Sequence, residues 1–120
     1  MKEELWRLTA TRMRDLIARR EVSREELVRA HFSRIDQVNA RLNAFVELRE
    51  EQALAEARDA DVHHSERKEL PLDGIPISIK EHYDVQGMKH TEGLPAWADR
   101  RSEVDEVAIR RLRQAGAIIV

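Results

Sequence analysis

Residues 71–80 read PLDGIPISIK, and this stretch decides the fold that the chain predicts. The leucine, aspartate and glycine at 72–74 are typical of a turn. From Ile75 to Ile79, isoleucines at alternate positions follow the two-residue period of a β-strand. The proline inside this run fits best near the start or the edge of a strand. We therefore expect a turn followed by a strand that ends at Lys80.

Three helices are expected before this stretch. The first runs from Ala10 to about Arg20 with Thr9 as its N-cap. The second follows a capping box formed by Ser23 and Glu26 and ends at asparagines 39 and 43, and the third covers about 50–65. Residues 44–48 between them could be a brief strand or an extended linker. The expected buried stripes are Ala10, Met13, Leu16 and Ile17, then Leu27, Ala30, Ile35 and Val38, then Ala53, Leu54, Ala57 and Ala60.

A loop, a helix and a second strand are expected after Lys80. Residues 81–95 contain glycines and a proline without periodicity, which indicates a loop. A helix over about 103–115 would be capped by Ser102 or Asp105, and Gly116 would end it. Residues 117–120 (AIIV) then form an apolar, β-forming run. The expected apolar face of this helix is Val104, Ala108, Leu112 and Ala115.

This order of elements predicts an α/β fold with a parallel sheet. We expect one domain over residues 1–120, helical over 1–69 and strand-loop-helix-strand over 70–120. All-apolar strands such as residues 117–120 are normally central and covered on both faces, and the sequence offers no evident cover for this one. An exposed strand edge there would invite strand addition, so a homo-oligomer or a docking module is one alternative.

Composition narrows the classes of function. The 120 residues include 21 basic and 23 acidic side chains, and the formal net charge of −2 is spread along the chain in both signs. This balance argues against a nucleic-acid or acidic-membrane partner. The chain has no cysteine, and its first residues contain neither a signal peptide nor a membrane span. These features suit a cytoplasmic protein.

Lys80 is the main candidate for chemistry. It ends an apolar strand and enters a glycine-containing loop, and ligands of open α/β sheets bind at the carboxyl ends of strands. An amine held there, partly removed from water, can act as a base toward a serine hydroxyl. The alternative from the residues alone is an ordinary exposed lysine that guards an edge strand.

The same stretch resembles a known family. Residues 71–81 (PLDGIPISIKE), followed by 83–88 (YDVQGM) and 91–93 (TEG), resemble the first conserved block of the amidase signature family. The resemblance covers nearly the whole chain, but it corresponds only to the beginning of a family domain several times longer. Segments similar to other parts of that beginning are 23–30, 34–36, 42–46, 53–61 and 112–120.

The resemblance implies a function and a role for Lys80. In this family a serine nucleophile is activated through a second serine, in a cis peptide, by the lysine that corresponds to Lys80. Both serines lie downstream in a glycine- and serine-rich stretch, so we expect an amidase fragment that is inactive alone. The substrate would be a small-molecule amide, and no cofactor or metal is expected. Ala40, Lys89, His90 and Leu94 depart from the common family pattern, which leaves the substrate class open.

Other polar residues carry weaker signals. Ser78 shares a face with Lys80 about 7 Å away along a strand, which is too far for direct proton transfer. His63 and His64 are adjacent, and His82 and His90 are eight positions apart, so neither pair has a metal-ligand spacing. Asp84 and the other aspartates fit caps or loop hydrogen bonds. Within the family, the amidase subunit of a tRNA-dependent amidotransferase is a further alternative, although the loop after Lys80 fits general amidases better.

Overall fold

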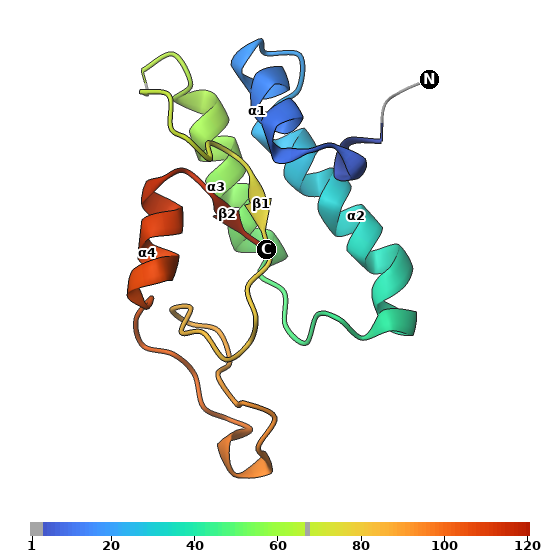
Figure 1. Ribbon diagram of the computed structural model, residues 1–120, viewed down its shortest axis with the longest axis vertical. Helices are drawn as coiled ribbons and strands as arrows, with labels where there is room; N and C mark the ends of the chain where they lie inside the picture. The colour runs from blue at the N-terminus through green and yellow to red at the C-terminus, as the bar shows by residue number, and fades with distance from the viewer. Residues whose placement is uncertain (1–3, 67) are drawn as a thin grey trace.

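The computed structural model describes residues 4–66 and 68–120. Positions 1–3 and 67 of the predicted helical part lie outside the described residues. The elements follow one another as expected, with α1, α2 and α3 first and then β1, a loop, α4 and β2 (Figure 1). In chain order they are η1 (Leu5–Arg7), α1 (Ala10–Ala18), α2 (Arg24–Leu42), α3 (Glu50–Val62), β1 (Pro76–Ile77), η2 (Pro95–Trp97), α4 (Val107–Gln114) and β2 (Ile118–Ile119).

The predicted helix signals before the sheet are confirmed. Thr9 accepts a hydrogen bond from the Arg12 amide at 3.2 Å, and both bonds of the Ser23–Glu26 capping box are present. Asn43 ends α2 in the left-handed conformation, with φ of 48°. Residues 44–48 form a linker without secondary structure.

The buried stripe is confirmed for α3 and is partly wrong for α1 and α2. Ala10 is exposed, and Ala30 and Val38 are only half-buried. Val28 and Phe32 are buried instead, because α2 packs against α1 and β1 on one side and against α3 and β2 on the other. A helix with partners on two sides buries a wider face than one amphipathic stripe.

The two strands pair in parallel, which confirms the predicted α/β class. Pro76 lies opposite Ile118 in the register, and Ile77 lies opposite Ile119. The Ile118 amide donates to the Ile75 carbonyl at 2.9 Å, and the Val120 amide donates to the Ile77 carbonyl at 3.0 Å. β1 is shorter than the expected strand to Lys80, because residues 78–80 have no neighbouring strand in the described part of the chain.

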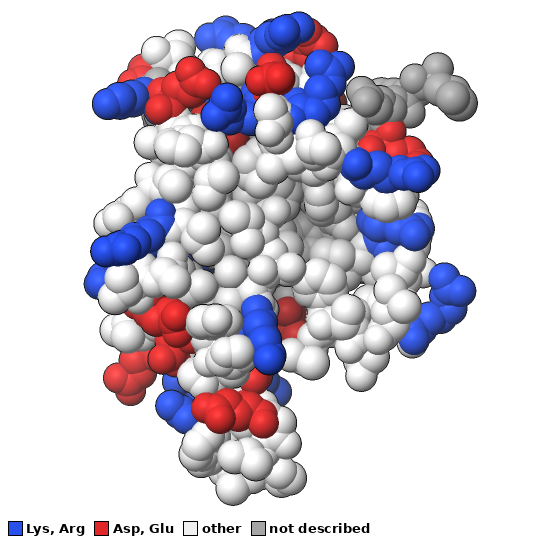
Figure 2. Space-filling model, viewed as in Figure 1, with Lys and Arg blue, Asp and Glu red and all other residues white. Residues whose placement is uncertain are grey.

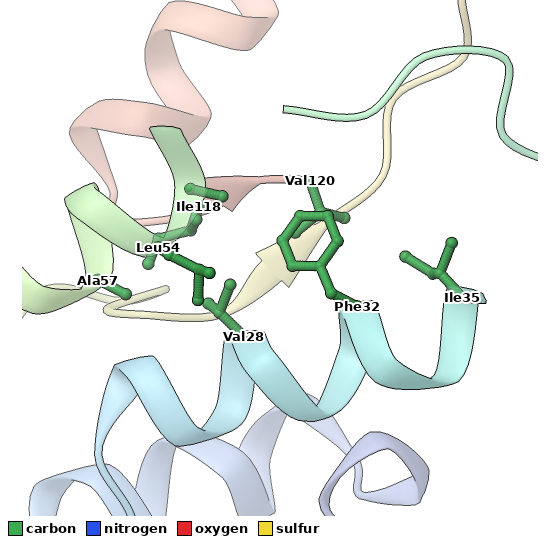
Figure 3. Close-up of a cluster of buried hydrophobic side chains, with 8 residues drawn as sticks. Val28, Phe32, Ile35, Leu54, Ala57, Ile118 and Val120 are labelled. Atoms are coloured by element: carbon green, nitrogen blue, oxygen red, sulfur yellow. The ribbon is translucent and has the colours of Figure 1, made fainter. Parts of the chain in front are cut away.

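Helices cover both faces of β2, so the expectation of an uncovered strand is wrong. Ile118 and Val120 point toward Phe32 of α2 and Leu54 of α3 (Figure 3). Ile119 points to the opposite face and packs with Ile109 of α4. The alternation of side chains along the strand thus distributes its residues between two cores. All four residues from 117 to 120 are buried.

The last helix begins later than predicted, and its expected apolar face is partly wrong, although Leu112 packs against the core as expected. α4 starts at Val107, Val104 and Ala108 are exposed, and Ile109 is the buried residue. Ser102 and Asp105 do not cap α4, because their side chains bond with the loop before it: the Ser102 hydroxyl donates to Asp84, and Asp105 accepts from the Gln86 amide. Because these two side chains are engaged by the loop, they cannot cap the first turn of α4.

The molecular surface mixes both signs of charge. Figure 2 shows uncharged surface across the middle of one face, with basic and acidic side chains together toward its ends. Within residues 4–66 and 68–120, no helix has the length and apolarity needed to cross a bilayer.

Candidate active site

Lys80 lies three residues beyond β1, at the carboxyl end of the strand, and its side chain is exposed. The neighbouring residues fix its backbone. Ile79 packs against the cluster of Val85, Ile109 and Ile119, and the Lys80 carbonyl accepts a bond from the Tyr83 amide at 3.0 Å. The lysine therefore lies on an anchored turn, with its side chain exposed beside this turn.

A hollow of about 510 Å³ opens beside Lys80. Residues 44–47, residues 78–81 and part of the 83–89 loop line it, together with Ile119 and Val120. Its position at the carboxyl ends of both strands is the usual place for a ligand in an open parallel sheet. The apolar strand end gives the hollow an apolar floor, and its lining also includes the basic side chains of Lys80 and Lys89 and the acidic ones of Glu47 and Glu81.

Glu81, the residue after Lys80, holds the far side of the loop. Its two carboxylate oxygens accept the backbone amides of Thr91 and Glu92, the latter at 3.0 Å. Burial opposes ionisation of Glu81, but these amides keep its pKa below the ordinary value. The charged carboxylate of Glu81 thus holds residues 91–92 close to the backbone next to Lys80.

A second polar network crosses the same loop. Asp84 accepts the Ser102 hydroxyl at 2.7 Å and contacts Nδ1 of His90 at 2.5 Å, while Nε2 of His90 lies 3.2 Å from Glu92. The carboxylate bridges serine and histidine, whereas a nucleophilic triad needs the histidine between serine and carboxylate. We therefore assign this network to loop structure and not to nucleophilic catalysis.

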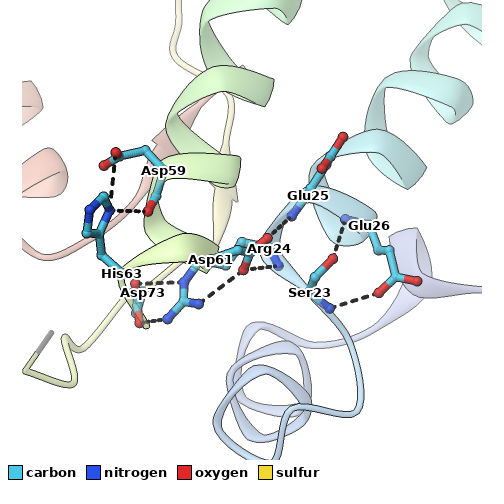
Figure 4. Close-up of polar contacts among 8 residues, drawn as sticks. All are labelled: Ser23, Arg24, Glu25, Glu26, Asp59, Asp61, His63 and Asp73. Atoms are coloured by element: carbon cyan, nitrogen blue, oxygen red, sulfur yellow. Dashed lines mark hydrogen bonds and ion pairs between the residues drawn. The ribbon is translucent and has the colours of Figure 1, made fainter. Parts of the chain in front are cut away.

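The most deeply buried charge lies at the opposite end of the sheet. Arg24 is 2% exposed and contacts Asp61 and Asp73, next to the Ser23–Glu26 capping box (Figure 4). Asp61 also accepts the amides of Arg24 and Glu25, both at 3.0 Å, so a side chain of α3 caps α2. This cluster joins α2, α3 and the turn before β1.

The other candidates stay apart from Lys80, with one exception. Ser78 is exposed and lines the same hollow. His63 bonds to the Asp59 carbonyl at 2.9 Å, and His82 stacks on Tyr83. In the described ranges, no three histidine, aspartate or glutamate side chains are grouped to hold a metal ion.

The sequence reasoning missed the Arg24 and His90 networks. Arg24 has partners 37 and 49 positions away, so no local pattern marks it. His90 had a local signal, since Asp84 and Glu92 lie six and two positions from it in one loop. A histidine between two nearby carboxylates can be recognised before a structure is known.

A parallel strand pair with helices on both faces is the layering of an α/β domain, and such domains bind ligands at the carboxyl ends of their strands, where Lys80 lies. Residues 26–120 match the family model described as Amidase. The chain belongs to the amidase signature family, as its sequence resemblance predicts.

The relatives are much longer than this chain. It is 36% identical over 118 residues to a glutamyl-tRNA(Gln) amidotransferase subunit of Moorella thermoacetica, a match that covers 98% of the chain and 24% of that relative. It is 38% identical over 119 residues to fatty-acid amide hydrolase 2-B of Danio rerio, covering 92% of the chain and 23% of that relative. The chain thus spans about a quarter of the length of these relatives.

Solved structures of amidases share the fold. A fatty acid amide hydrolase matches with a TM-score of 0.90 and 27% identity over 99% of this chain and 22% of its own. The native peptide amidase of Stenotrophomonas maltophilia matches with a TM-score of 0.87 and 29% identity over 95% of this chain and 24% of its own.

Proposed function

We propose that this chain is the part of an amidase that supplies the catalytic base, Lys80, for hydrolysis of an amide C–N bond. The observation that carries the proposal is the position of Lys80 at the carboxyl end of β1, beside a hollow of about 510 Å³. Family membership supports the reaction class, because the relatives include an amidotransferase subunit and a fatty-acid amide hydrolase.

The mechanism follows the family pattern. Lys80, in its neutral form, takes a proton through one serine from a second serine, whose oxygen attacks the amide carbonyl carbon. The proton returns from Lys80 through the first serine to the leaving nitrogen as the C–N bond breaks. Water then attacks the acyl-serine ester and gives a proton to Lys80 by the same route, and this proton returns to the serine oxygen as the carboxylic acid leaves. The two serines belong to the larger domain, and the network of Asp84, His90 and Ser102 cannot replace them, because its histidine does not contact the serine.

The purified 120-residue chain is therefore expected to release no amine from aliphatic, aromatic, peptide or fatty-acid amides. A chromogenic or mass-spectrometric assay of amine release tests this expectation. Turnover by the purified chain that disappears in a Lys80→Ala variant would contradict it. Turnover that persists in that variant would indicate a contaminating hydrolase.

A second candidate is the amidase subunit of a tRNA-dependent amidotransferase. The observation that favours it is the 36% identity to the amidotransferase subunit of Moorella thermoacetica. This candidate predicts that the protein that contains the chain takes part in amidation of glutamyl-tRNA(Gln) and does not hydrolyse fatty-acid amides. The opposite selectivity would favour a general amidase.

A further inference from the structure

We propose that His90 is a positioning residue: in its charged form it clamps the loop beside Lys80, and deprotonation loosens that loop. The geometry carries this inference. His90 is 6% exposed, and both of its ring nitrogens face carboxylate oxygens, Nδ1 toward Asp84 at 2.5 Å and Nε2 toward Glu92 at 3.2 Å. A neutral imidazole carries only one N–H, so it would leave one carboxylate facing a lone pair.

The clamp lies within the outgoing arm of the loop, residues 84–92, and is connected to the returning arm through Asp84. Asp84 lies on the outgoing arm, and it also accepts the hydroxyl of Ser102 on the returning arm. Backbone bonds continue the connection: Gly87 donates to the Ser102 carbonyl at 2.8 Å, Ser102 to Met88 at 3.0 Å and His90 to Arg100 at 3.0 Å. Met88 lines the hollow of Lys80, so the order of these arms sets the shape of that hollow.

The charges around His90 favour its protonated form on balance. Its neighbours are the carboxylates of Asp84 and Glu92, the more distant carboxylate of Glu81 and one opposing cation, Arg100. The hydrogen bond to Asp84 raises the pKa of His90 most, partial burial lowers it, and Glu92 raises it further. A raised pKa in the folded state means that the stabilisation is complete below the ordinary value near 6.5 and disappears as the pH rises through the folded value.

Asp84 sets the lowest pH at which the clamp is formed. The Ser102 hydroxyl and His90 hold the pKa of Asp84 below its ordinary value of 3.8. Stabilisation from a carboxylate with a lowered pKa is present above the ordinary value and is lost as the pH falls through the folded one. The loop should therefore be most ordered between these two titrations.

Hydrogen exchange of the 120-residue chain tests the clamp, with protection factors corrected for intrinsic exchange. The amides of Gly87, His90 and Ser102 report on the loop, and the amides of α2 report on the whole fold. As the pH is raised through the titration of His90, we expect the loop amides to lose protection about tenfold while the amides of α2 keep theirs. In NMR spectra, His90 should keep protons on both ring nitrogens to a higher pH than an ordinary histidine with a pKa near 6.5.

Two variants make the test specific. His90→Gln cannot be charged, so its loop should show the low protection of the high-pH state at every pH. His82→Gln removes an exposed histidine of the same loop and should behave like the original chain. A His90 that loses its second ring proton at or below the ordinary pKa near 6.5, or an equal pH-dependent loss in His90→Gln, would overturn the proposal. Because loop order is measured instead of turnover, this outcome is independent of the amidase proposal.

Discussion

At the scale of single residues, Arg24 combines deep burial with charge. Its guanidinium is 2% exposed and contacts two carboxylates, Asp61 and Asp73. Burial alone would lower the pKa of Arg24, but the bonds and charges of Asp73 and Asp61 outweigh burial and raise it. Such a cluster stabilises the fold only while every charge in it has its partner, because a buried charge without a partner destabilises the folded state.

Arg24→Met should therefore destabilise the protein by about 3 kcal/mol, because it leaves two carboxylates near each other without a countercharge. Urea unfolding followed by circular dichroism measures this change. The matched control is Arg29→Met, since Arg29 pairs with Glu25 on the same helix but its side chain is 55% exposed. The control should cost less than about 0.5 kcal/mol, and equal losses in the two variants would contradict a special role for the buried cluster.

The roles of single residues were predicted correctly from the sequence where the hydrogen-bond partner lies close along the chain. Thr9, Ser23 and Asn43 were correctly expected at helix ends, because capping depends on residues within one turn. Arg24 was not foreseen, because burial of an arginine depends on carboxylates that only the folded chain brings to it. Lys80 was expected to end a strand, but β1 ends three residues earlier, at Ile77, because residues 78–80 have no neighbouring strand in the described part of the chain.

At the scale of elements, Gly116 fixes the approach of α4 to the turn before β1. Its φ is 96°, and a Cβ atom would lie 2.8 Å from the Asp73 Cα. The Gly74 amide also donates to the Gly116 carbonyl at 2.9 Å, which brings the two backbones together. This contact requires a residue without a side chain.

Gly116→Ala should cost about 2 kcal/mol or more, from a strained backbone and a clash with backbone atoms. Gly87→Ala separates these two causes, because Gly87 also has a positive φ, of 83°, but open space around its missing Cβ. The Gly87 variant should lose only the conformational part, about 1 kcal/mol. Thermal unfolding of both variants gives the comparison, and an equal loss would mean that close packing at Gly116 contributes nothing.

The Ser23 capping box gives a second prediction at this scale. Ser23→Ala should destabilise α2 and the fold by about 1 kcal/mol, since the Glu26 amide loses its acceptor. Ser33→Ala, at an exposed position in the middle of the same helix, should be neutral or slightly stabilising. Urea midpoints distinguish the two, and a neutral Ser23 variant would show that the cap is dispensable.

Element boundaries were harder to predict than element types. The pattern before α4 suggested a helix from 103, but Ser102 and Asp105 serve the loop at 84–90, and α4 starts at Val107. Helix periodicity in the sequence cannot show that a capping residue is already engaged by a distant segment. The same reason explains the misplaced apolar face, where Ile109 is buried instead of Val104.

At the scale of the whole molecule, the sheet edge beside β2 is partly covered. Arg49 donates to the Ile119 carbonyl at 3.0 Å, and Glu56 holds the same guanidinium. An added strand would have to displace this bond. Self-association through the edge is thus expected to be weak, and sedimentation over a range of concentrations checks it: a dimer that persists on dilution would favour the docking alternative.

The central claim is the catalytic role of Lys80, and a hybrid enzyme tests it most directly. In the hybrid, residues 1–120 replace the matching segment of the Danio rerio fatty-acid amide hydrolase 2-B, and the rate of fatty-acid amide hydrolysis is measured. Lys80→Ala should lower kcat by about 10²- to 10⁴-fold, while Lys89→Ala, in the same hollow, should leave it within a few-fold. A folded Lys80→Ala hybrid that hydrolyses the amide at the unsubstituted rate would contradict the account.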